Sequence, residues 1–135
     1  MTALHDLPAQ DLLAAYRQRT LSPVEVTQAV LAHMARWEPH IRATYLLRPE
    51  HALAQARASE ARWLRGEPQG LLDGVPVTIK ENIATQGDPT PLGTAAVPLV
   101  PAAADAPPAA RLREAGAVMV AKTTMPDYGM LSSGL

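Results

Sequence analysis

Two apolar segments in the second half of the chain constrain its fold more than any other feature. Residues 75–80 read VPVTIK, so apolar side chains alternate with others at the period of a β-strand. Residues 117–121 read AVMVA and are continuously apolar, as in a strand buried on both faces. A helix from Asp105, its expected N-cap, to Glu114 is predicted between them. Strand, helix and strand in this order predict a right-handed crossover between parallel strands at 75–80 and 117–122.

The first half of the chain is predicted to be helical. Ser22 and Glu25 have the spacing of a capping box, and a proline follows Ser22 at the first helical position. This helix is expected to stop by Glu38, because Pro39 follows it. Three helices are expected to pack outside the sheet, within 9–18, 23–37 and 50–65, with Trp37 and Trp63 as core anchors.

Composition narrows the class of protein. The 135 residues are 47% hydrophobic with a formal net charge of −1, as in a globular chain that binds neither nucleic acid nor an anionic membrane. There is no cysteine, and the four histidines lack metal-ligand spacing, so no metal or other cofactor is expected. The sequence shows no signal-peptide pattern and no run apolar enough to span a bilayer. We therefore expect a soluble cytoplasmic protein.

The basic residues are unevenly divided, because all are arginines except Lys80 and Lys122. A lysine can lose its proton in a desolvated site, whereas an arginine stays charged. Each lysine closes a predicted strand, and functional sites of parallel sheets lie beyond the carboxyl ends of the strands. Both amines are thus expected at the same edge. Either a site there needs a deprotonatable amine, or codon bias has left two lysines that solvate the strand ends.

Six segments, in order along the chain, resemble the amidase signature family. Residues 74–83 (GVPVTIKENI) resemble its lysine segment, and residues 87–90 (GDPT) look like its glycine-x-proline-threonine turn. The others follow at family-like spacings: SPVE at 22–25, DA at 105–106, RLREAGA at 111–117 and KTTMPDY at 122–128.

This resemblance implies an α/β fold in which N-terminal helices precede the first strands of a mixed sheet sandwiched by helices. Residues 1–135 would form the N-terminal part of that domain. It also implies hydrolysis or transfer at a carboxamide C–N bond by a Ser–cis-Ser–Lys triad. In this family a neutral lysine acts as base toward a serine on a cis peptide bond, which relays the proton of the nucleophilic serine. Lys80 matches that lysine, whereas Lys122 matches a segment whose implied role is structural.

The chain departs from the family pattern in two ways. Glu81 stands where aspartate is more usual, and the sequence ends before the Gly/Ser-rich stretch that carries the two serines. Residues 129–133 resemble a segment that lines the acyl pocket, so neither serine in it is expected to be the nucleophile. The predicted substrate-binding residues are Gly129, Met130, Leu131 and Ser132.

Two kinds of function are consistent with these features. The first is an enzyme, either an amidase acting on a small linear amide or an A-subunit-like portion of a tRNA-dependent amidotransferase. The second is a non-catalytic truncated product that serves as a scaffold. Because only the base of the triad is present, we expect the chain alone to be inactive. A buried strand without its neighbours also predicts self-association, or association with a complementary C-terminal part.

Overall fold

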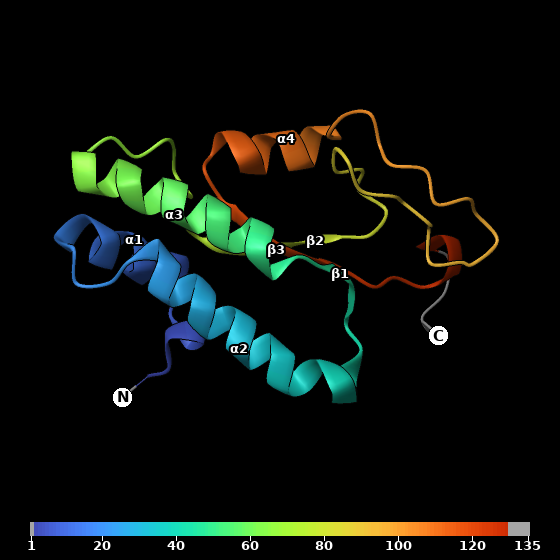
Figure 1. Ribbon diagram of the computed structural model, residues 1–135, viewed down its shortest axis with the longest axis horizontal. Helices are drawn as coiled ribbons and strands as arrows, with labels where there is room; N and C mark the ends of the chain where they lie inside the picture. The colour runs from blue at the N-terminus through green and yellow to red at the C-terminus, as the bar shows by residue number, and fades with distance from the viewer. Residues whose placement is uncertain (1, 130–135) are drawn as a thin grey trace.

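The computed structural model describes residues 2–129 and confirms the predicted α/β class (Figure 1). In chain order the elements are η1 (Leu4–Asp6), α1 (Ala9–Gln18), α2 (Pro23–Ile41), β1 (Thr44–Leu47), α3 (Pro49–Arg65), β2 (Pro76–Lys80), α4 (Pro107–Glu114), β3 (Val118–Thr123) and η2 (Asp127–Gly129). In Figure 1, α2 and α3 run alongside each other, and α4 lies on the other side of α3. No helix in this part of the chain is both long and apolar enough to cross a membrane.

The three strands form one mixed sheet in the order β1-β3-β2. β2 pairs with β3 in parallel, from Pro76 opposite Val118 to Lys80 opposite Thr123, with one irregularity along the pair. The helix α4 connects these two strands. The predicted parallel crossover is therefore confirmed, and it leaves β2 at the edge of the sheet formed by the described residues.

The strand β1 was not predicted from the sequence. It pairs antiparallel with β3, with Leu47 opposite Ala121, and just beyond it the amide of Thr124 donates to the carbonyl of Ala43 at 2.9 Å. Four residues are too few to establish a period of two in the sequence. The strand forms because β3 offers its other edge, and this is a tertiary effect.

The helix α2 begins as predicted and ends later than predicted. The Ser22 side chain accepts from the amide of Glu25 at 3.1 Å, and the Glu25 carboxylate accepts from the amide of Ser22 at 2.8 Å. The expected stop at Glu38 is wrong, because the helix contains Pro39 and continues to Ile41. A proline this close to the end removes one amide donor, and Glu38 still accepts from the amides of two later residues, Arg42 and Thr44.

We expect the Ser22→Ala substitution to destabilise the chain by about 1 kcal/mol, because it leaves the Glu25 amide without its cap. Ser22→Asp keeps an acceptor at the same position and should be nearly neutral. Urea unfolding followed by far-UV circular dichroism measures both variants. Equal stabilities of the alanine and aspartate variants would contradict a capping role for the hydroxyl.

The core lies between the helices and the sheet. One cluster joins α1, α2 and α3 through Leu12, Tyr16, Val26 and Trp63, and a second joins α3 to β3 through Ala52, Ala56, Val118 and Val120. The Trp63 indole donates to the carbonyl of Asp73 at 3.1 Å, so its predicted role as a core anchor is confirmed.

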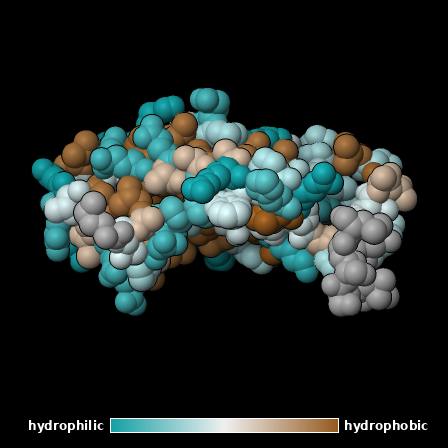
Figure 2. Space-filling model, turned by 90° about the horizontal axis from the view of Figure 1, so that it is seen from below, coloured by the Kyte–Doolittle hydropathy of each residue, from teal (hydrophilic) through white to brown (hydrophobic). Residues whose placement is uncertain are grey.

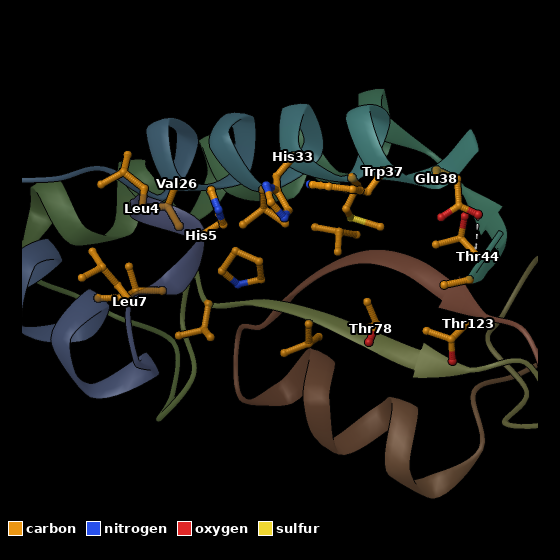
Figure 3. A pocket seen from close by; sticks show the side chains of 18 of the residues that line it. Leu4, His5, Leu7, Val26, His33, Trp37, Glu38, Thr44, Thr78 and Thr123 are labelled. Atoms are coloured by element: carbon orange, nitrogen blue, oxygen red, sulfur yellow. Dashed lines mark hydrogen bonds between the residues drawn. The ribbon is translucent and has the colours of Figure 1, made fainter. Parts of the chain in front are cut away.

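The expectation that Trp37 is a core anchor is wrong, because 43% of this residue is exposed. Trp37 lines an apolar groove of about 700 Å³ between α2 and the edge strand β2. Figure 3 shows Trp37 and His33 reaching from α2 toward this groove, with Thr78 and Thr123 across it. Seen from below, hydrophobic surface shows between the hydrophilic side chains (Figure 2). Within residues 2–129, no further segment of the chain covers this groove.

Candidate active site

Lys80 is the last residue of β2, at the carboxyl end where a parallel sheet carries its sites. Its side chain is exposed, and among residues 2–129 its amine forms no ion pair. The backbone around it is fixed on both sides. The Glu81 amide donates to the carbonyl of Thr123 at 2.9 Å, and the Ile83 amide donates to the carbonyl of Lys80 at 3.0 Å. Lys80 is thus an accessible amine on a rigid strand end.

The two lysines lie at the same end of the sheet but on opposite faces. Lys122 pairs with Ile79 rather than with Lys80, which pairs with Thr123. Paired residues of neighbouring strands share a face, and side chains alternate along each strand. Burial agrees, because Lys122 and Ile79 are 2% and 4% exposed whereas Lys80 is exposed. The expectation that both lysines lie at the same edge is confirmed, but their amines lie on opposite faces there and do not converge.

Three segments meet beyond the ends of β2 and β3. The Glu81 carboxylate accepts from the amide of Gly93 at 2.6 Å. The Tyr128 amide, after β3, donates to the carbonyl of Leu92 at 2.8 Å. Gly93 has a φ of +73°, and a Cβ there would lie 2.6 Å from the carbonyl oxygen of Pro126. The residue after Lys80, the loop around 93 and the turn after β3 are therefore packed together.

A shallow cavity of about 290 Å³ lies where these segments meet. The residues that line it are Tyr45, Glu81, Pro91, Gly93, Thr94, Leu99, Thr124 and Met125. Gly129, one of the predicted substrate-binding residues, lies at the end of η2 with a φ of +71°, and its amide donates to the carbonyl of Pro126. The other three, Met130, Leu131 and Ser132, fall outside the described residues. Gly129 is not among the residues that line the cavity, but a Cβ there would lie 3.1 Å from the side chain of Met125, which does line it. Substrate binding by all four residues stays a prediction.

The long loop before α4 is held by hydrogen bonds at its base. The Gly87 amide donates to the carbonyl of Ala102, and the Ala102 amide donates to the carbonyl of Asp88. The expectation that Asp105 caps α4 is wrong. Its carboxylate accepts instead from the Gln86 amide at 2.7 Å and from the Arg113 side chain at 2.6 Å. Burial opposes the charge of Asp105, but these two donors outweigh it and lower its pKa.

A buried carboxylate that was not singled out in the sequence supports the start of β2. Asp73 is fully buried and accepts from Arg62 at 2.6 and 2.9 Å and from the Gln69 amide at 2.7 Å. The next residue, Gly74, has a φ of +83°, and a Cβ there would lie 2.7 Å from the Ser59 hydroxyl. The segment LDG at 72–74 precedes the predicted strand, and an aspartate before a glycine was the only signal of a turn there.

Comparison with known proteins agrees with this architecture. The family model described as Amidase matches residues 25–135. The chain is 40% identical over 133 residues to a glutamyl-tRNA(Gln) amidotransferase subunit of Chloroflexus aurantiacus, covering 98% of this chain and 27% of that protein. It is 37% identical over 129 residues to the putative amidase AmiD of Mycobacterium bovis, covering 96% of this chain and 27% of that protein.

Among solved structures, the native peptide amidase from Stenotrophomonas maltophilia superposes with a TM-score of 0.83 at 31% identity. The match covers 91% of this chain and 26% of that structure. The sheet and its helices are arranged as in the matching part of such amidase structures. The chain belongs to the amidase family, and it spans about a quarter of the length of the curated relatives it matches.

Proposed function

We propose that this chain supplies the base, Lys80, of an amidase active site that hydrolyses the C–N bond of a small carboxamide. The observation that carries the proposal is the place of Lys80 in the fold. It is the lysine at the carboxyl end of the edge strand β2, on the open face, beside the segments that meet around Gly93. Lys122, at the neighbouring strand end, lies on the other face of the sheet, away from the open face that carries Lys80.

The chemistry requires groups that the described residues do not bring to Lys80. A lysine accepts a proton from a serine only when burial or nearby cations make the neutral amine accessible near neutral pH. The nucleophilic serine, the serine that relays its proton and the oxyanion donors would come from the polypeptide that corresponds to the remainder of the relatives. Packing of that polypeptide over the open face would desolvate Lys80 and complete a Ser–cis-Ser–Lys triad.

Two surfaces suit such a complementary C-terminal part. The outer edge of β2 has unpaired backbone groups among the described residues, and its Thr78 and Lys80 side chains are exposed. The groove between α2 and β2 exposes Trp37 and Ile41, which are 43% and 61% accessible. An edge strand beside an apolar groove accepts a further strand with a packed element next to it. Two copies of the chain would compete for the same surfaces by self-association.

We expect the chain alone to show no amidase activity, because a base without a nucleophile and an oxyanion site cannot complete acyl transfer. A chimera tests the proposal, with this chain in place of the matching first quarter of the putative amidase from M. bovis. Release of ammonia from simple aliphatic and aromatic amides should be measurable for the chimera and absent for the chain. Turnover by the chain alone would contradict the proposal, and so would a folded chimera that is inactive.

The amidotransferase relatives support a second candidate function of the same chemistry. In it the acyl group of the amide would still pass to water, but the ammonia that leaves would attack an activated acyl acceptor instead of escaping to solvent, and the chain would act within a larger assembly. Measuring amidated acceptor against free ammonia in the chimera distinguishes transfer from hydrolysis. A folded chimera that is inactive in both assays would favour the third alternative, a non-catalytic scaffold. A cytoplasmic location stays a prediction from the sequence.

A further inference from the structure

Lys122 is a buried cation that the proposed reaction does not use. It lies near the end of β3, and only 2% of it is exposed. Among residues 2–129 its amine has no hydrogen-bond partner. Burial lowers the pKa of Lys122, while the charges of Asp88 and Glu81 act in the opposite direction. Burying an amine without a direct partner lowers the stability of the fold. The two carboxylates are the groups whose charges can offset this loss.

The two carboxylates hold the loop that follows Lys80. Glu81 is 3% exposed and accepts from the Gly93 amide. Asp88 accepts from the Thr85 hydroxyl at 2.8 Å and pairs with Arg48 at 2.7 Å. Asp88, Arg48 and Lys122 line one small cavity of about 100 Å³. Arg113 also lines this cavity, but it is paired with Asp105. Arg48 and Lys122 are therefore left to balance Asp88, in the same cavity, and Glu81, whose charge also acts on Lys122, and these four form a partly buried charge cluster.

We propose that Lys122 is a positioning residue for Lys80, acting as the cation that balances Glu81 and Asp88 from the opposite face of the sheet. Without it the cluster keeps two carboxylates and one arginine, and the excess negative charge lies in a poorly solvated site. Glu81 is bonded directly to Lys80 along the chain, and its amide is tied to Thr123. Loss of the balance would therefore displace Glu81 and the Gly93 loop, and with them the strand end that carries Lys80.

The importance of Lys80 in this proposal rests on the proposed function. The role of Lys122 can nevertheless be tested without measuring the hydrolysis of an amide. The chain has two lysines, so lysine labelled with ¹³C at Cε gives one signal for each, and Lys122→Met assigns them. In Asp88→Asn we expect the titration midpoint of Lys122 to fall by about 1 pH unit, because a carboxylate that favours the ammonium has been removed. Asp11→Asn is the control, since this exposed carboxylate on α1 neither lines the cavity of Lys122 nor acts on its charge and should leave Lys122 unchanged.

Lys122→Met tests the effect on the loop and on Lys80. We expect hydrogen-exchange protection of the Gly93 and Ala102 amides to fall about tenfold, with a shift of the Lys80 signal and no change in α1. Adding Asp88→Asn to Lys122→Met should restore part of the protection, which a loss of packing alone would not allow.

Unchanged protection and an unchanged Lys80 signal in a folded Lys122→Met variant would overturn the proposal. If that variant does not fold, Asp88→Asn and Glu81→Gln decide, because a Lys122 midpoint that neither substitution moves also overturns it. An inactive chimera with these shifts intact would instead count against the proposed function alone.

Discussion

In the chimera with the remainder of an amidase relative, Lys80→Ala is expected to lower the turnover of amides by about 10³-fold. Lys80→Arg should lose as much, because a guanidinium cannot act as a base. Initial rates of ammonia release measure both variants. The fold should survive in each case, since the hydrogen bonds that fix the strand end are made by backbone groups and do not depend on the amine.

Arg57→Ala is the matched control for removing a cation from the surface. Arg57 lies exposed on α3, away from the carboxyl end of β2. Its loss should leave turnover within about twofold of the parent, as is usual for an exposed charge away from a site. Near-normal turnover of either Lys80 variant, with equal amounts of folded protein, would remove Lys80 from the reaction.

The second large effect is expected for the Arg62–Asp73 ion pair that supports the start of β2. Asp73→Ala should destabilise the chain by about 3 kcal/mol, because it leaves Arg62 and the Gln69 amide without their acceptor. That is a large fraction of the 5–15 kcal/mol typical of a whole domain. Urea unfolding measures the loss. Arg111→Met breaks the solvent-exposed pair with Glu114 and should cost little by comparison.

The same carboxylate predicts a pH dependence of stability. Burial opposes the charge of Asp73, but the Arg62 side chain and the Gln69 amide, which donate to it, outweigh burial and lower its pKa below the usual value. Because the folded pKa lies below the unfolded one, this stabilisation is complete above the unfolded value, about 3.9, and is lost as the pH falls through the folded value. Asp73→Ala should therefore unfold with a weaker pH dependence below about pH 4. Parallel acid curves for parent and variant would contradict this.

Local sequence patterns were sufficient to predict most of the helices and the parallel crossover. The capping box at Ser22 and the glycine after α3 are interactions between near neighbours in the chain, so the sequence contains both partners. The alternation at 75–80 and the apolar run at 117–121 likewise identify β2 and β3 before any contact is known. The family resemblance could predict Lys80 as the base for the same reason, because the matching motif is contiguous in the sequence.

The predictions for Asp105 and Trp37 were wrong, and β1 was missed, because each depends on parts of the protein distant in the chain. Asp105 does not cap α4 because Gln86 and Arg113 reach its carboxylate first, and β1 exists only because β3 lies beside it. Trp37 is exposed because nothing in the described chain covers its groove.

The sequence by itself determined most of the helices and the two parallel strands, and it placed a lysine at the end of each of these strands. Only the tertiary structure decided which of the two lysines is accessible. The register of β2 against β3 places Lys80 and Lys122 on opposite faces, and the helices bury one of these faces. Register depends on hydrogen bonds between residues far apart in the chain, whereas the motif around each lysine is the same on either face.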